Sequence, residues 1–323
     1  NRDNREAAIE DLRFAYVPGE QWPADKKNEY ATDGRPCLEF NDLPTFIGQV
    51  IGDQRQTKPS AKVHPVDSNG DPEVAKVIEG LIRNIEEVSS ADIAYDTAFE
   101  HTTGGGFGFW RVITKYNSDD SFEQDIAVEP IVNCFSVIFD PASVKYDKTD
   151  AQWLIIHSSI SKDVYKEKYP NNNSSDFQIE DKHNIDLNID EDKVRIAEYL
   201  YKKPITKKIY QLDDGSVVYE VPEGLKITRE RNVNSYEIRR VLVDGYNILE
   251  EEQVWPSKYW PVVPVEGKSI NIAGKQYTWG LVRHAKDATR AYNYSRCREI
   301  EMFAMAPLAP YMATAKQVQG YEN

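Results

Sequence analysis

The sequence predicts a mixed α+β fold, with helices towards both ends of the chain and antiparallel strands in the middle. Apolar residues recur at helical spacing over residues 4–103, whereas aromatic and β-branched runs alternate with polar turns over 107–267. A helical pattern returns near residue 277. We therefore expect a mixed helical and antiparallel β domain over residues 1–276, a long helix over 277–305 and a terminal segment over 306–323.

Local signals predict the first three helices. Residues 4–16 repeat apolar side chains at helical spacing up to a proline–glycine pair at positions 18 and 19. A short helix begins at Pro23 and stops at Gly34. The pattern LPTFIGQVIGDQRQ predicts a third helix over 43–56.

Two further helices are expected to form an αα-hairpin. Asp71 is a typical N-cap and Pro72 suits the first helical position. Apolar residues then recur on one face, at positions 74, 78, 81, 82, 85 and 88. The segment SSADIAYDTAFEHTT begins the second helix with a serine cap, and the pair leads the chain to a cluster of glycines.

The middle of the chain is expected to be mainly antiparallel β-sheet. The runs at 107–116 and 122–132 are separated by the turn SDDS and predict a β-hairpin. Further strand-like runs, with a short helix at SKDVYKEKY, extend over residues 152–160, 193–204, 207–213, 215–221, 234–245 and 259–267. The polar interval 170–193, rich in Asn and Asp, predicts a mobile loop.

Composition restricts the class of protein. No apolar run approaches the roughly 18 residues of a membrane span, so we expect a soluble protein without a membrane partner. The three cysteines are far apart, which suits a reducing compartment better than a disulfide framework. A formal net charge of -14 disfavours tight binding of nucleic acid over the whole surface, although a local basic patch stays open.

Four glycines, Gly104, Gly105, Gly106 and Gly108, raise the question of a phosphate-binding loop. Such a loop needs a strand before the glycines, a helix after them and usually a lysine that follows directly. Here a helix precedes, a strand follows, and no lysine occurs until Lys115. We interpret the glycines as a structural hinge, with at least one positive φ and a close backbone approach at the start of the strand.

Signals for metal binding or catalysis are weak. Residues 186–193 open like a calcium loop, but Glu191 stands where the loop needs glycine and Ala197 where it needs glutamate, so we favour a solvated acidic loop. The five histidines show no metal-binding spacing, and no catalytic signature is present. We predict no catalytic residue, metal or cofactor, and therefore no enzyme.

The C-terminal helical pattern carries the most informative charges. Its five arginine and lysine candidates for a binding role are Arg283, Lys286, Arg290, Arg296 and Arg298. The first three lie at i, i+3 and i+7 on one stripe, beside a small-to-apolar stripe made by Leu281, Ala285, Ala288 and Tyr292. Two interpretations stay open: a solvated surface helix, or a helix that packs against copies of itself and leaves polar faces for solvent or a charged polymer.

Six stretches stand in a characteristic order and spacing along the chain: FAYVPGEQW (14–22), GRPCLEFNDL (34–43), IGDQRQTKPSAKVHPV (51–66), AYDTAFEHTTGGGFGFWRVITKY (94–116), VIFDP (137–141) and GLVRHAKDATRAYNYSRCREIEMFAMAPLAPYM (280–312). Together they resemble the portal proteins of short-tailed (podovirus-type), double-stranded DNA bacteriophages. None of the stretches alone is a catalytic signature.

The resemblance implies a ring of about twelve subunits at one capsid vertex, closed by head-to-tail contacts. Its partners would be the terminase large subunit, tail adaptor proteins, scaffolding and capsid proteins, and the double-stranded DNA that passes through during genome packaging and ejection. Residues 1–276 would be the wing, 277–305 a stem helix and 306–323 the start of the clip. The five cations would be DNA-channel or subunit-contact residues.

Full-length relatives continue beyond the position of Asn323, so the resemblance also implies that these residues are an N-terminal fragment. The sequence begins at Asn1 rather than methionine, with a charged amphipathic segment, which predicts trimming at the front. The expected location is the virion, with the host cytoplasm during assembly.

Two other functions remain as alternatives. One is a phosphate-processing or nucleotide-binding enzyme that uses the glycine loop and the acidic cluster at 181–192. The other is a tail or adaptor binding module, which would lack the long helix and its proline-bounded end.

Overall fold

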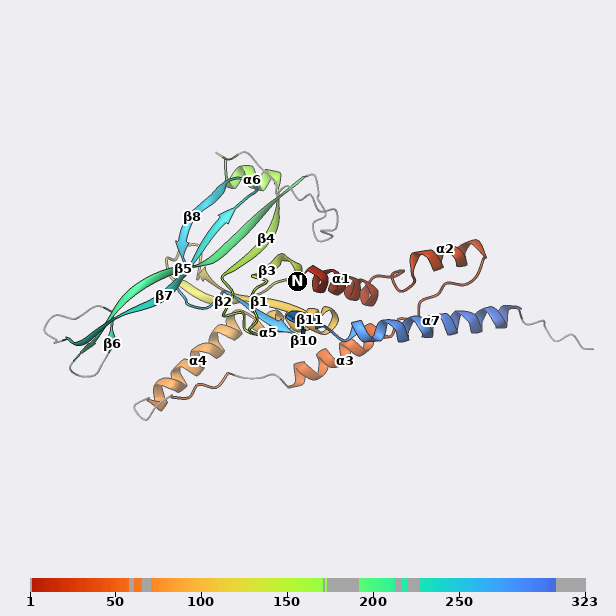
Figure 1. Ribbon diagram of the computed structural model, residues 1–323, viewed down its shortest axis with the longest axis horizontal. Coiled ribbons are helices and arrows are strands. Elements are labelled where there is room, and N and C mark those ends of the chain that lie inside the picture. The colour runs from red at the N-terminus through yellow and green to blue at the C-terminus, as the bar shows by residue number, and fades with distance from the viewer. Residues whose placement is uncertain are drawn as a thin grey trace, which may run out of the picture. The chain divides into compact units, whose positions relative to one another are not determined.

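The computed structural model (Figure 1) describes residues 2–57, 61–65, 71–170, 172, 192–212, 217–219 and 227–305. Contacts divide the chain into two compact units. Unit 1 contains Lys58–Thr102 and Phe107–Gly267, and unit 2 contains Arg2–Thr57, Thr103–Gly106 and Lys268–Asn323. The chain therefore passes into unit 2 and back at the glycine cluster.

Unit 2 begins with the three helices that the sequence predicts. They are α1 (Arg2–Tyr16), α2 (Ala24–Thr32) and α3 (Leu43–Gln56). Pro23 precedes α2, and Gly34 beyond its end has a φ of +67°, a value that glycine adopts readily. The N-terminal helical prediction is confirmed.

The rest of unit 2 is a β-hairpin followed by the long helix α7 (Val282–Met305). The hairpin, β10 (Lys268–Ile272) and β11 (Lys275–Trp279), was not expected from the sequence. Its two loop residues, Ala273 and Gly274, have φ values of 51° and 84°, as a tight hairpin turn requires. Since β11 runs to Trp279, α7 begins later than the predicted residue 277.

Unit 1 begins with the two helices that the sequence predicts, whereas their packing as an αα-hairpin stays a prediction. Helix α4 (Pro72–Val88) is capped by Asp71, whose side chain accepts a hydrogen bond of 2.8 Å from the backbone N–H of Glu73. Helix α5 (Ala91–Gly105) follows and ends in the glycine cluster, of which Gly104, Gly105 and Gly106 lie in unit 2 and Gly108 lies in unit 1. Only Ala75 of α4 is buried, so the apolar face that the sequence predicts is largely exposed.

Two antiparallel sheets form the remainder of unit 1. The smaller has the order β2 (Gln124–Pro130), β1 (Phe107–Tyr116), β9 (Val262–Glu266). The larger has the order β3 (Val137–Phe139), β4 (Trp153–Ser161), β5 (Lys193–Leu212), β7 (Ile227–Val243), β8 (Ile248–Val254), with β6 (Val217–Val218) paired to the end of β5. Helix α6 (Lys162–Lys168) follows β4, capped by Ser161. The predicted α+β class is confirmed.

Strand β5 is one strand of 20 residues, where the sequence predicts two runs. Pro204 does not interrupt it, because beyond Tyr201 the strand pairs with β7 and no longer with β4. A proline is tolerated there, since N–H groups on the unpaired side need no strand partner. Strands β3 and β8 were also not expected as strands.

The core of unit 1 lies between its two sheets. It contains Phe109 and Val262 from the smaller sheet and Phe139, Leu154 and Leu200 from the larger, all less than 9% exposed.

The two units divide the chain differently from the predicted wing of residues 1–276, because α1–α3 group with α7. The wing, stem and clip division describes parts of a ring and stays a prediction, and its clip segment, 306–323, lies outside the described residues.

Candidate functional site

The buried carboxylate of Asp11 in α1 anchors α7. Arg283 donates a hydrogen bond of 2.7 Å from Nε to Asp11 Oδ2, and Lys286 Nζ lies 2.6 Å from Oδ1. Asp11 is fully buried and Lys286 is 9% exposed, so these charges meet away from water, where their interaction is strong. Two of the five predicted contact residues therefore hold α7 to α1 within unit 2.

Arg290 lies on the same face of α7. Its guanidinium carbon is 5.2 Å from the ring centroid of Phe14 in α1, and Lys286 Nζ is 5.9 Å from the same centroid. Arg290 Nη1 also lies 3.4 Å from Oδ1 of the exposed Asp287. The prediction that Arg283, Lys286 and Arg290 share a stripe is confirmed, and that stripe contacts α1.

Arg296 and Arg298 are more exposed. Their side chains are 48% and 59% exposed, and they pair with Glu299 at 2.8 Å and Glu301 at 2.9 Å along the helix. Arg35 also donates to both carboxylate oxygens of Glu301, at 3.2 Å each. The hydrogen bond from Arg35 lowers the pKa of Glu301, against the opposing effect of burial.

Sequence reasoning missed a polar contact at the middle of α7. The amide of Asn293, 1% exposed, donates to Gln21 Oε1 at 2.7 Å and accepts from the backbone N–H of Phe40 at 2.9 Å. Cys297 Sγ accepts from the backbone N–H of Leu38 at 3.2 Å. An asparagine inside a helix was the available signal, because its side chain competes with helical hydrogen bonds unless it has another partner.

The predicted small-to-apolar stripe of α7 borders a groove with α3 and the segment before it. The groove has a volume of about 380 Å³. Its lining comprises Phe40, Asp42, Leu43, Phe46, Ala285, Ala288, Thr289 and Tyr292. Three of the four predicted stripe residues line it, whereas Leu281 is 48% exposed at the helix start.

Backbone fills the space beside two of the four glycines, Gly106 and Gly108, and side chains lie beside the other two. Gly106 has a φ of +103°, and a Cβ there would lie 2.7 Å from the Trp279 backbone. A Cβ on Gly108 would lie 2.0 Å from the carbonyl oxygen of Ala98 in α5. The predicted positive φ and close approach are both confirmed, while a hinge role for Gly104, Gly105, Gly106 and Gly108 stays a prediction.

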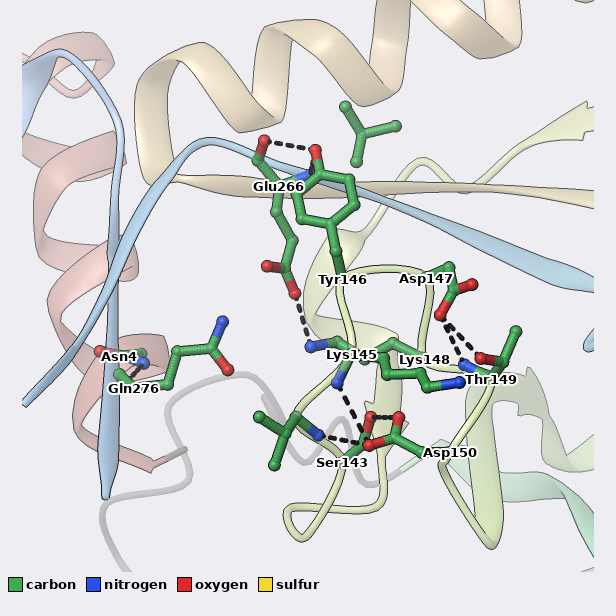
Figure 2. A network of polar contacts seen from close by, with 12 residues as sticks. Asn4, Ser143, Lys145, Tyr146, Asp147, Lys148, Thr149, Asp150, Glu266 and Gln276 are labelled. Atoms are coloured by element: carbon green, nitrogen blue, oxygen red, sulfur yellow. Dashed lines mark hydrogen bonds and ion pairs between the residues drawn. The ribbon is translucent and has the colours of Figure 1, made fainter. Parts of the chain in front are cut away.

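A loop between β3 and β4 forms most of the polar contacts drawn in Figure 2. Asp150 accepts hydrogen bonds from Ser143 Oγ at 2.6 Å and from the backbone N–H groups of Val144 and Lys145 at 2.7 and 3.2 Å. Burial acts to raise the pKa of Asp150, but these hydrogen bonds outweigh it and lower that pKa. Lys148 Nζ pairs with Glu266 of β9 at 2.7 Å, so the network ties this loop to the smaller sheet.

Some predictions fall where the structure gives no description. Most of the calcium-like run 186–193, of the acidic cluster 181–192 and of the polar interval 170–193 lies outside the described residues, and so do the prolines predicted to end α7. Within the described ranges, no group of three or more His, Cys, Asp or Glu side chains is placed to hold a metal ion. In the same ranges, no helix is long and apolar enough to cross a membrane.

Comparison with known proteins matches a protein family and a curated relative. A family model described as "Phage P22-like portal protein" matches residues 1–323. A portal protein of Acyrthosiphon pisum secondary endosymbiont phage 1 is 30% identical over 313 residues, which cover 90% of this chain and 43% of the relative. The chain thus spans less than half the length of this curated relative.

Proposed function

The chain belongs to the phage P22-like portal protein family, and from this we propose that it forms part of the ring through which a phage genome is packaged and ejected. The observation that carries the proposal is the family match over residues 1–323. Portal proteins are structural ring-forming proteins of a phage vertex. A ring of identical copies closes when each copy offers its neighbour two different, complementary surfaces.

Charge supports a role as a conduit. The net charge of -14 opposes extended contact with phosphate groups. DNA that must slide through a channel along its whole length has to be held weakly, and about six to ten phosphate contacts already bind tightly at low salt. We infer that motion of the DNA is driven by a separate terminase, and that tail adaptors, scaffolding and capsid proteins dock on the assembled ring.

The glycine cluster gives little support to the enzyme alternative. A phosphate cradle needs open space beside backbone N–H groups. Near Gly106 and Gly108 that space holds the backbone of Trp279 and Ala98. We therefore propose a structural protein, made in the host cytoplasm and carried in the virion.

The ring proposal has a direct test in the natural chain that contains residues 1–323. We expect this protein to form closed rings with a central channel, seen by electron microscopy, and capsids assembled without it to hold no DNA. The control is the same capsid assembly carried out with the purified protein added back. Monomers at every concentration, or normal DNA filling without the protein, would contradict the proposal.

Among the five cations of α7, we propose Arg296 and Arg298 as the best candidates for contact with DNA or a neighbouring subunit. Their guanidinium groups are about half exposed, whereas Arg283 and Lys286 pair with a buried carboxylate. We expect Arg296→Gln with Arg298→Gln to reduce DNA-filled capsids about tenfold while the protein stays folded.

The control for the arginine pair is Arg2→Gln. Arg2 is 57% exposed and forms the same kind of one-turn ion pair, with Glu6 in α1. We expect this variant to fill capsids normally. Equal filling by the double variant and the control would show that Arg296 and Arg298 do not take part in packaging.

A further inference from the structure

An apolar stripe on α4 has no partner within the described part of the chain. Five aliphatic side chains, from 43% to 73% exposed, form what we call the α4 stripe: Val74, Val77, Ile78, Leu81 and Val88. Contiguous exposed apolar surface on a helix is unfavourable in water and marks a binding face.

The packing of α4 on its own unit leaves the stripe free. The helix contacts β2, buries Ala75, packs Ile85 against a small buried cluster of α5 and β2, and receives a hydrogen bond of 3.0 Å from Tyr95 Oη to Glu86 Oε1. These contacts use the side of α4 that carries Ala75, Ile85 and Glu86, whose centre lies about a quarter turn from the centre of the stripe. The stripe is therefore a surface that unit 1 presents outward.

A second exposed surface of unit 1 has complementary character. Beyond Tyr201, β5 pairs with β7 and no longer with β4, so the two strands form a ribbon that extends past β4 and β8 and is joined near its tip by β6 (Figure 1). Residues directly opposite in an antiparallel pair share a face. One such face, which we call the ribbon face, combines Lys203, Lys207, Arg229 and Arg231 with Ile205, Ile209 and Val233.

The charges of the two surfaces are opposite. Residues 71–88, which are α4 and its N-cap, hold five acidic and two basic side chains, and Glu73 and Glu87 lie beside the stripe. The ribbon face holds four exposed cations, of which Lys207 pairs with Glu237 at 3.5 Å and Lys203 with Glu252 of β8 at 3.9 Å. Two acidic side chains therefore face four cations, and the face stays net positive. Both surfaces also offer aliphatic side chains, so apolar contact and ion pairs can form together.

We propose that the ribbon face of one copy docks on the α4 stripe of a neighbouring copy. This inference rests on the proposed ring and names the surfaces that join its subunits. Two different surfaces on one chain give a head-to-tail contact, which is the kind that closes a ring. Nucleic acid fits the pair poorly, because the aliphatic residues of both surfaces gain nothing from phosphate groups.

The first test is ring formation by the natural chain that contains residues 1–323, measured by mass photometry. We expect Val77→Glu with Leu81→Glu, and separately Lys207→Glu with Arg231→Glu, to reduce rings at least about tenfold. Adding Glu73→Lys and Glu87→Lys to the ribbon variant should restore rings. Phe122→Glu, at a side chain 99% exposed in unit 1, is the control and should leave rings intact.

The second test detects the contact without requiring a closed ring. A Leu81→Cys variant mixed with a Lys207→Cys variant should form a disulfide-linked pair that neither variant forms alone. Rings that persist in the α4 and ribbon variants, or a charge exchange that fails to restore them, would overturn the inference and leave the ring function standing. A wild-type chain that never forms rings contradicts the ring function, and the absence of the disulfide-linked pair then overturns the inference too.

Discussion

Replacement of Gly108 by alanine is expected to lower the free energy of unfolding of unit 1 by about 3 kcal/mol or more. The new Cβ would lie 2.0 Å from the carbonyl oxygen of Ala98 and less than 3 Å from two further backbone atoms of that residue. The neighbour is helix backbone, which cannot rotate away as a side chain can. Either β1 or α5 must move, and β1 is the central strand of its sheet.

The matched control is Gly80→Ala. Gly80 lies in α4 of the same unit, and a Cβ there meets nothing within 4 Å. Alanine is favoured over glycine inside a helix by about 0.5–1 kcal/mol, so this variant should be slightly more stable than wild type. Urea unfolding followed by circular dichroism measures both. Unfolding of the two variants at the same urea concentration would contradict the close contact between Gly108 of β1 and the backbone of α5.

Elements with signals in their own residues were predictable from the sequence. Helix α4 is an example, because Asp71, Pro72 and the apolar spacing all lie within the helix or beside it. Which side of that helix is buried was not predictable. The most apolar side is exposed, and the buried side is chosen by contact with β2, far along the chain.

Strand β8 shows why other elements were missed. Its sequence, ILEEEQV, has three consecutive glutamates and no clear alternation. Two of these carboxylates pair across the sheet, Glu250 with Arg240 and Glu252 with Arg239, both at 2.9 Å. Cross-strand partners of this kind stabilise a strand that its own residues do not indicate.

The candidate site was predictable in position and not in its contacts. The stripe of cations on α7 follows from helical spacing alone. Asp11, which binds two of those cations, lies 272 residues before Arg283 in a charged segment where an acidic side chain is unremarkable. Its complete burial is a property of the packed unit, so the sequence offered no reason to connect it with α7.

Replacement of Asp11 by asparagine is expected to destabilise unit 2 by about 3 kcal/mol. The change keeps the size of the side chain and removes the charge that faces Arg283 and Lys286. Lys286 is 9% exposed, and its other acidic neighbour, Glu10, is 76% exposed and lies 3.6 Å away. A buried cation without its counter-charge is costly, and here one substitution affects two cations.

Two further variants separate lost charge from lost packing. Asp287→Asn removes a carboxylate that is 97% exposed and pairs with Arg290, so its effect should stay within about 0.5 kcal/mol. Asp11→Leu combined with Arg283→Met and Lys286→Met should recover most of the stability, because apolar side chains of similar volume can replace a buried ion pair. Hydrogen exchange at the amides of α1 and α7 reports unit 2 directly. If Asp11→Asn leaves that exchange unchanged, the buried carboxylate does not hold α7 to α1.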